Sequence, residues 1–405
     1  MGTVIDLSVG NLVVDWGKNE LFRDHRSLFQ KSDVRHVEAG HDRGGGEGTI
    51  HTLARPLREL LPRLTLLGYT LDGAREEYDG LLQFHALESS KFPSFDTFMA
   101  ALCRVDIGGV SGDYEDDHSF GEFFREEIGP RIGVETLFDD SNFGKWDFAY
   151  MMENFHPWYV LILIAQVPAN LSLPVVWDYF EHMKNGWSEA EDFVPELKPE
   201  ERFIIVTEGS SDSKVIQKAF ASLHSEVLDF FTFIDMEEGY PFSGSGNLAS
   251  FCRGLIKIGI QNKTIVLFDN DAEGVSKHKA LQNISYPNTM QVIRLPDLPE
   301  LCSVSAIGTS GETLDDINGK AASIEAYLDL RWKATRPAVV RWTNYVQALG
   351  VYQGALDSKE FYVRNFLSLR EADKGYDTSK LSVVLSALLQ TAGTIARSHQ
   401  ARIEY

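Results

Sequence analysis

From Phe203 to Leu295 the chain alternates short apolar runs with amphipathic stretches, and this alternation constrains the fold more than any other feature. The predicted strands cover residues 203–207, 227–235, 264–269 and 290–295. The predicted helices between them cover residues 215–223, 248–260 and 275–284. Strands that alternate with helices of this length form a mostly parallel sheet with helices on its faces. The middle of the chain is therefore predicted to be a Rossmann-like α/β domain.

The segments on either side of this domain are predicted to be mainly helical. Residues 3–16 alternate apolar and polar side chains around Gly10-Asn11, the pattern of a β-hairpin with a tight turn. Apolar residues elsewhere recur at helical spacing, and an acidic, proline-containing segment at 188–202 indicates a linker. The predicted flanking helices lie near 53–67, 75–85, 94–104, 118–127, 147–167, 321–332, 339–350, 359–370 and 380–396.

These patterns predict an α+β multidomain protein. We expect a mostly helical N-terminal domain with a short β-hairpin at 1–195, the parallel α/β domain at 200–330 and a helical C-terminal region at 331–405. A chain of 405 residues is long enough to form several hydrophobic cores.

Charge and cysteine usage limit the functional classes. The chain has 59 acidic and 38 basic residues, a net charge of −21, whereas proteins that bind nucleic acid usually carry a basic surface. The acidic surface either serves solubility alone, or local basic stretches and bound cations make the contact with phosphates.

The three cysteines form no C-x-x-C pair, which argues against a zinc module and a disulfide framework. No signal peptide or membrane-length apolar run occurs, so we expect a soluble cytoplasmic protein without a membrane partner.

Four carboxylates are expected at one edge of the predicted sheet. Glu208 and Asp212 follow the first strand in VTEGSSD, and Asp269 and Asp271 follow the third strand in FDNDAEG. Ligands of a parallel sheet bind at the carboxyl ends of its strands. Clustered carboxylates repel one another, and a hard cation such as Mg²⁺ relieves the repulsion. Taken singly, Asp212 would be explained as a helix cap and the D-x-D as a solvated turn.

This order of motifs, E-G-x-x-D after one strand and D-x-D after another, resembles the Toprim fold shared by topoisomerases, bacterial primases, recombination proteins and several nucleases. The resemblance covers about residues 200–330. It implies that Glu208 is the general acid/base or a metal ligand, that Asp269 and Asp271 hold Mg²⁺ or Mn²⁺, and that Asp212 supports this metal shell. The chain has neither a zinc module for a primase nor room for the arch of a type IA topoisomerase, so hydrolysis of phosphodiester bonds is the simplest expectation.

A further motif lies downstream of the fourth strand. Ser323-Ile324-Glu325 resembles the S-x-E of nucleases of the overcoming-lysogenisation-defect (OLD) family, although no Walker A motif for an attached ATPase occurs. The resemblance implies that Ser323 and Glu325 contribute to a metal site, and a fifth carboxylate favours two ions. Otherwise Glu325 is an exposed helix residue. Lys320, close to this motif, is a candidate to neutralise the phosphate in the transition state.

The front of the chain carries a second resemblance. Residues 14–30 and 53–78 look like the N-terminal domain of bacterial HEPN/Toprim conflict proteins, and the match covers most of 1–195. It implies an effector of antiviral or abortive-infection defence, with the front domain sensing infection or restraining the nuclease. Because such a nuclease would harm its host, we also expect self-association or a regulatory partner. Arg35 and His41 also fit the R-x(4–6)-H spacing of HEPN ribonucleases, but they precede a glycine-rich loop, and such pairs arise by chance.

A basic cluster is the candidate nucleic-acid contact. It consists of Arg331, Lys333, Arg336 and Arg341, interleaved with Trp332 and Trp342. Arginine and aromatic side chains stack on unpaired bases, although a helix-end salt-bridge face explains the cluster equally simply.

The predicted function is a Mg²⁺-dependent endonuclease for which RNA, including tRNA, is slightly favoured by analogy with other defence effectors. The alternatives are a DNA nickase and a non-hydrolytic sensor or scaffold whose acidic site binds a cation or a nucleotide signal.

Overall fold

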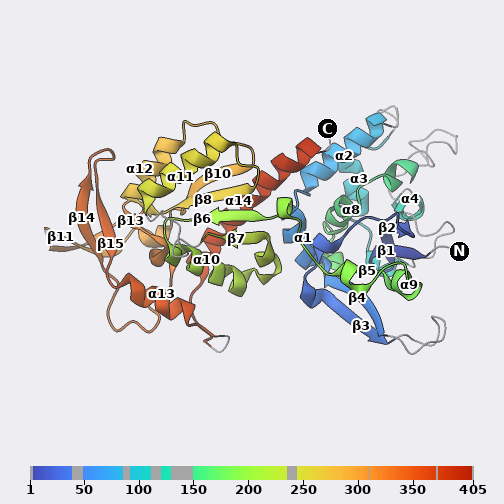
Figure 1. The fold of residues 1–405 in the computed structure, drawn as a ribbon, viewed down its shortest axis with the longest axis horizontal. Helices are drawn as coiled ribbons and strands as arrows, with labels where there is room; N and C mark the ends of the chain where they lie inside the picture. The colour runs from blue at the N-terminus through green and yellow to red at the C-terminus, as the bar shows by residue number, and fades with distance from the viewer. Residues whose placement is uncertain are drawn as a thin grey trace. The chain divides into compact units, whose positions relative to one another are not determined.

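The structure, a computed structural model, describes residues 3–38, 49–84, 92–110, 120–128, 149–234, 244–309, 311–370 and 373–403. The chain forms two compact units, Met1–Lys198 and Pro199–Tyr405 (Figure 1). Both units combine sheets and helices, which confirms the predicted α+β multidomain fold. The bounds predicted for three domains stay predictions.

The first unit contains an antiparallel sheet of strand order β2-β1-β5-β4-β3. Its strands are β1 (Val4–Val9), β2 (Leu12–Lys18), β3 (Val34–Glu38), β4 (Thr49–Pro56) and β5 (Pro174–Asp178). The pair β1–β2 confirms the predicted hairpin. The other strands were not predicted, because β5 pairs with segments more than a hundred residues away and local periodicity does not report such pairing.

Helices pack around this sheet. The described ones are α1 (Leu57–Leu66), α2 (Leu71–Phe84), α3 (Phe95–Leu102), α4 (Phe120–Phe123), α8 (Pro157–Ile164) and α9 (Phe180–Lys184). The helix predicted from Leu53 begins only at Leu57, because Leu53 is a buried residue of β4. Every residue of α8 is buried, as its continuous apolar run predicts.

The second unit contains the predicted parallel sheet, with strand order β10-β8-β6-β7. Its strands are β6 (Phe203–Val206), β7 (Phe231–Phe233), β8 (Lys263–Phe268) and β10 (Met290–Arg294). The chain passes from β6 to β7 on one side and later to β8 on the other side. The ends of β6 and β8 are therefore neighbours at a point where the strand order reverses, which is the usual place for a ligand in such sheets.

Helices cover both faces of this sheet. They are α10 (Ser210–Leu223), α11 (Ser245–Ile258), α12 (Ala272–Leu281) and α14 (Ser379–Ile403). In Figure 1, α11 and α12 lie on one face and α10 on the other. Helix α14 packs against α10, β8 and β10. This layered arrangement holds the strand ends in fixed positions.

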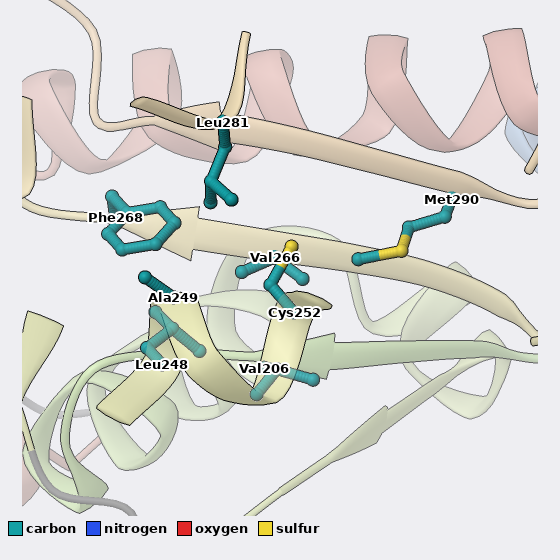
Figure 2. Close-up of a cluster of buried hydrophobic side chains, with 8 residues drawn as sticks. All are labelled: Val206, Leu248, Ala249, Cys252, Val266, Phe268, Leu281 and Met290. Atoms are coloured by element: carbon teal, nitrogen blue, oxygen red, sulfur yellow. The ribbon is translucent and has the colours of Figure 1, made fainter. Parts of the chain in front are cut away.

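An apolar cluster joins α11 and α12 to the sheet. Figure 2 shows Val206 of β6 and Val266 and Phe268 of β8 on the side of the sheet that faces Leu248 and Cys252 of α11. Side chains alternate between the two faces of a strand, so the intervening Leu267 is buried on the opposite face. Full burial of one such side chain stabilises a fold by about 1.5–3 kcal/mol.

The C-terminal part of this unit contains more β-structure than predicted. A sheet of order β12-β11-β14-β15 is formed by β11 (Val304–Gly308), β12 (Gly311–Asp315), β14 (Val340–Val346) and β15 (Val351–Leu356). The predicted helix at 339–350 is therefore wrong. This segment is rich in β-branched and aromatic residues, which favour strands, and Gly350, at a φ of 69°, helps close the hairpin.

The predicted helix at 321–332 is also wrong. Its place is taken by the short strand β13 (Ala321–Ala322) and a single 3-10 turn, Ile324–Tyr327. The helical predictions at 359–370 and 380–396 are confirmed by α13 (Lys359–Leu367) and α14.

One described segment, Ser379–Gln400 of α14, has the length and composition of a membrane-crossing helix. However, α14 packs against the parallel sheet, and its Leu381, Leu385 and Leu388 are fully buried. Its apolar character is therefore explained by its place in the core of the second unit.

Candidate active site

The four carboxylates predicted after β6 and β8 lie at the carboxyl edge of the parallel sheet. Glu208 follows β6, and its Oε1 accepts a hydrogen bond of 3.0 Å from the backbone N–H of Asp269, which follows β8. Parallel pairing of Val206 with Val266 brings the two strand ends to the same level. One side chain thus bridges the two predicted motifs directly.

A glycine makes room for this bridge. A Cβ atom on Gly274, in the first turn of α12, would lie 2.4 Å from the carbonyl oxygen of Asp269 and 3.0 Å from Oε1 of Glu208. The first distance is too short for any side chain and the second would force the Glu208 carboxylate to move, so glycine at the third position after Asp271 lets the helix approach this closely. The G of D-x-D-x-x-G therefore has a steric role.

Asp212 is held in the first turn of α10. Its Oδ2 accepts a hydrogen bond of 3.0 Å from the backbone N–H of Gly209, and its Oδ1 accepts one of 3.3 Å from the hydroxyl of Ser211. The helix-cap role is therefore present. Asp212 is nevertheless buried, and its charge acts on the other carboxylates, which a cap alone does not require.

Asp271 caps α12 and contacts the C-terminal hairpin. Its Oδ1 accepts a hydrogen bond of 2.7 Å from the N–H of Gly274, and its Oδ2 accepts one of 2.5 Å from the side-chain amide of Gln353 on β15. The Oε1 of Gln353 in turn accepts a hydrogen bond of 3.0 Å from the N–H of Glu273. The sequence did not predict Gln353 as a site residue, because a helix predicted at 339–350 gave no reason to place the residues after it near Asp271.

Glu325 lies close enough to act electrostatically on Asp212 and Asp269. It occupies the 3-10 turn after β13 and is buried, with 3% of its surface exposed, so the alternative of an exposed helix residue is excluded. The hydroxyl of Ser323 donates a hydrogen bond of 2.6 Å to its Oε2. Because β13 pairs with the strand β9 (Asn270–Asp271), the S-x-E segment is anchored beside the D-x-D motif.

Asn270, between the two aspartates, organises the surrounding backbone. It is fully buried; its side-chain amide donates to Oδ1 of Asp297 at 2.9 Å, and its Oδ1 accepts from the N–H of Gly319 at 3.0 Å and from the guanidinium of Arg294. These bonds join the end of β10 and the loop before β13 to the D-x-D. The central residue of the motif is therefore structural.

Burial and mutual repulsion raise the pKa values of three of these carboxyls. Burial, followed by the charges of neighbouring carboxylates, raises the pKa of Glu208 to about 8. Burial and the charge of Glu325 raise the pKa of Asp212 to about 7. Burial and the charges of the other four carboxylates, Asp271 among them, raise the pKa of Asp269 well above its ordinary value. The five groups thus form one cluster in which each added negative charge costs free energy.

The donor atoms of this cluster suit a hard divalent cation, because all are carboxylate or hydroxyl oxygens. In the part of the chain that the structure describes, no group of three or more His, Cys, Asp or Glu side chains is arranged to hold a metal ion. Instead, Glu208, Asp212, Asp271 and Glu325 each accept a hydrogen bond from an N–H or O–H group. The ions Mg²⁺ and Mn²⁺, and their number, stay predictions.

Lys320 contacts the site through its backbone. The backbone of Lys320 pairs with that of Asp271 in an isolated parallel β-bridge. The Lys320 ammonium donates a hydrogen bond of 2.9 Å to the backbone carbonyl of Asp316. Among the described residues Lys320 forms no ion pair with a carboxylate of the cluster. Its predicted role toward a phosphate stays a prediction.

The predicted nucleic-acid contacts lie outside the carboxylate cluster. Arg341 on β14 pairs with Asp357 at 2.7 Å, and Arg331 approaches Asp377 at 3.8 Å. Lys333 lies over the ring of Trp332, and Arg336 is exposed. Arg331 and Arg341 thus form salt bridges, as the alternative interpretation of the basic cluster predicts. Binding of nucleic acid by these four residues stays a prediction.

Two further sequence candidates have separate outcomes. Arg35 lies on β3 and donates to the carbonyl of Ser32, whereas His41 lies outside the described residues, so the proposed pair stays a prediction. Near the cluster, the N–H of Gly244, directly before α11, donates to the backbone carbonyl of Glu208 at 3.1 Å. This amide therefore supports the Glu208 backbone.

Two cations beside the cluster were also missed. Lys359 and Arg364 on α13 line a cleft of about 560 Å³ together with Ser211 and Glu325. The Lys359 charge favours the ionised form of Asp212 and so opposes the rise in its pKa. No sequence motif marks these residues, because α13 reaches the site through its packing against α10 and against the turn Ile324–Tyr327.

Comparison with known proteins identifies the first unit. Residues 1–201 match the family model described as HEPN/Toprim N-terminal domain 1, which confirms the resemblance predicted for the front of the chain. No curated protein and no solved structure matches the chain. The match over residues 1–201 shows that the first unit is similar to the N-terminal domain of HEPN/Toprim proteins.

Proposed function

We propose that the second unit is a Mg²⁺- or Mn²⁺-dependent endonuclease that hydrolyses phosphodiester bonds in nucleic acid, and that it resembles the OLD nucleases. RNA, including tRNA, is slightly favoured over DNA as substrate. The similarity of residues 1–201 to the N-terminal domain of HEPN/Toprim proteins supports a nuclease-like activity. The observation that carries the proposal is the single cluster formed by Glu208, Asp212, Asp269, Asp271 and Glu325.

The cost of this cluster argues for a function. Two like charges about 5 Å apart repel by roughly 3 kcal/mol at an effective dielectric constant of about 20. A fold that needed only stability would place apolar or neutral residues at these positions. Five carboxylates beside the carboxyl edge of a parallel sheet instead supply the oxygen atoms that a bound divalent cation would draw together.

The side chains suggest distinct roles. Asp269, Asp271, Asp212 and Glu325 would hold the cations, with the hydroxyl of Ser323 fixing the orientation of Glu325. A bound divalent cation would polarise the scissile phosphate and lower the pKa of a coordinated water. Glu208, whose pKa is about 8, gains or loses a proton near neutral pH and is therefore suited to general acid/base transfer.

Cleavage assays test this proposal. Purified protein is incubated with tRNA, single-stranded DNA and supercoiled plasmid in Mg²⁺, Mn²⁺ or EDTA. We expect cleavage only with a divalent cation, and a loss of at least about 100-fold in Glu208→Ala and Asp269→Ala. Glu200→Ala, which removes an exposed carboxylate of the same unit, serves as the control.

The same assay separates the alternatives. Relaxation of the plasmid without cleavage of RNA would identify a DNA nickase. Absence of metal-dependent cleavage on every substrate would refute the nuclease proposal and leave a sensor or scaffold that binds a cation or a nucleotide. Full activity in both alanine variants would place the active site elsewhere.

We also propose that the chain acts in bacterial antiphage defence, with the first unit sensing infection or restraining the nuclease, and with self-association or a regulatory partner as the restraint. Phage challenge of cells that express the wild type or Asp269→Ala tests this role. Protection by the wild type alone, accompanied by new RNA ends in sequencing, is the expected result. Equal protection by both proteins would contradict it.

A further inference from the structure

A cleft lies between α13, the start of α10 and the S-x-E turn. It measures about 560 Å³, within the range of small-molecule sites of roughly 300–1,000 Å³. Ser211 and Glu325 form one wall, and the residues of α13 form the other. Ser211 hydrogen-bonds Asp212, and Glu325 belongs to the carboxylate cluster. The cleft therefore opens directly beside the proposed catalytic centre.

The α13 wall combines two cations and the carboxylate of Glu360 with an apolar surface. Lys359, Val363 and Leu367 follow one another at four-residue spacing, so they form a row along the helix, and Arg364 lies in the adjacent row. Val363 and Leu367 are half-buried, whereas both cations are exposed. A surface of this kind suits a ligand with an anionic part and a flat, weakly polar part.

The side chains of the two cations form no direct polar contact within the described structure. Neither Lys359 nor Arg364 forms an ion pair or a side-chain hydrogen bond with another described residue, although the chain has 59 acidic residues against 38 basic ones. The Lys359 charge acts on Asp212, and among the described residues the side-chain N–H groups of both cations have no hydrogen-bond acceptor, so they can donate to an anionic ligand that enters the cleft. Phosphate is the anion that matches both side chains.

We propose that this cleft binds one unpaired nucleotide of the substrate strand, next to the phosphodiester that is cut. Lys359 and Arg364 contact its phosphate, and Val363 and Leu367 contact its sugar and base. A base enters such a cleft only when it is not stacked within a duplex, so the substrate is a single strand or an unpaired loop. This inference rests on the proposed function, because it assigns the cleft to the substrate of that site.

Binding to a labelled 12-nucleotide single-stranded RNA, followed by fluorescence anisotropy in EDTA and in Ca²⁺, tests the cleft without a cleavage readout. We expect Lys359→Gln/Arg364→Gln to bind at least about tenfold more weakly than wild type. Its plot of log affinity against log salt should be shallower by about 0.7, because both side chains contact one phosphate and each lost single-strand phosphate contact removes about 0.7. Wild type should prefer the single strand over the matching duplex by about tenfold or more.

A matched control removes the same charge elsewhere on the second unit. Lys257→Gln/Lys279→Gln neutralises two exposed lysines on α11 and α12 and should bind RNA like wild type. Unchanged affinity and salt slope in the α13 variant, with its melting temperature preserved, would overturn the proposal, as would equal binding of single strand and duplex by wild type. If the α13 variant loses binding while wild type shows no metal-dependent cleavage, the cleft stands and the nuclease proposal fails.

Discussion

The side chain of Glu208 and the backbone of Asp269 are joined by a hydrogen bond of 3.0 Å. This bond links the ends of two adjacent parallel strands, β6 and β8, through an acidic side chain. The carboxylate that we propose for proton transfer is therefore oriented by the residue that we propose as a metal ligand. Gly274, the next close neighbour of both, determines whether they keep this geometry.

Substitution Gly274→Ala should damage both stability and activity. The added Cβ would meet the Asp269 carbonyl at 2.4 Å, so α12 or the strand end must shift. We expect a loss of about 1–3 kcal/mol in the free energy of unfolding, the usual cost of overpacking, measured by urea denaturation. Metal-dependent cleavage should fall at least about tenfold, because Glu208 is displaced.

Gly254→Ala provides the matched control in α11 of the same unit. A Cβ on Gly254 meets no atom within 4 Å, and this helical glycine is exposed. The substitution should leave cleavage unchanged and raise the free energy of unfolding by about 0.4–1 kcal/mol. Wild-type stability and activity in Gly274→Ala would show that the close approach around Glu208 is not required.

The raised pKa values predict how stability depends on pH. The pKa values of Glu208 and Asp212 are about 8 and about 7 in the folded chain, against ordinary values of 4.5 and 3.8. Folding therefore favours the protonated carboxyls. Their contribution to stability is complete below these ordinary values and is lost as the pH rises through 7 and 8. In EDTA the melting temperature should fall between pH 5 and pH 8.5, and Mg²⁺ should raise it more at pH 8 than at pH 5.5, by at least about 5 °C.

Two pairs of substitutions distinguish the effect of these carboxyls on the melting temperature from the effect of the net charge of the chain. Glu208→Gln/Asp212→Asn should flatten the pH dependence and reduce the Mg²⁺ effect. Glu20→Gln/Glu191→Gln, which removes two exposed carboxylates of the first unit, should behave like wild type. An equal Mg²⁺ effect on wild type at both pH values would contradict the proposed link between these carboxyls and cation binding.

The sequence was sufficient to predict the parallel sheet and the positions of four carboxylates. Strand and helix periods in 203–295 are regular, and the carboxyl ends of parallel strands meet at one edge, so Glu208 and Asp269 could be placed together before the structure was known. The S-x-E segment was located by its motif, although its helix prediction was wrong. Local pattern and strand order are thus enough for the centre of the site.

The surroundings of the site could not be predicted in this way. Gln353 and Lys359 reach the carboxylates from β15 and α13, which follow the D-x-D by about eighty residues or more. Their positions depend on the hairpin β14–β15 and on packing of α13 against α10, and neither is encoded in a local period. The same limit explains why β5, at the centre of the N-terminal sheet, was missed.

Ser323→Ala should weaken cation binding without unfolding the protein. The Ser323 hydroxyl donates a hydrogen bond of 2.6 Å to Oε2 of Glu325, and removing a group that orients a metal ligand typically costs 10–100-fold in metal affinity. A titration of cleavage with Mg²⁺ should therefore shift to at least about tenfold higher concentration. Ser323→Thr keeps the hydroxyl and should recover most of the affinity. Ser250→Ala, at an exposed helical serine, is the control, and an unshifted titration in Ser323→Ala would exclude this role.

Gln353 offers two substitutions with different expected responses to Mg²⁺. Its amide donates to Asp271, and its Oε1 accepts from the N–H of Glu273. Gln353→Leu removes both bonds, so thermal unfolding should show a lower melting temperature in EDTA and in Mg²⁺ alike. Gln353→Glu keeps the acceptor for Glu273 but places a negative charge against Asp271. This variant should be destabilised mainly in EDTA and should show a larger rise in melting temperature with Mg²⁺ than wild type, because a cation bound by Asp271 removes the repulsion. The same Mg²⁺ response in Gln353→Glu and wild type would mean that no cation binds at Asp271.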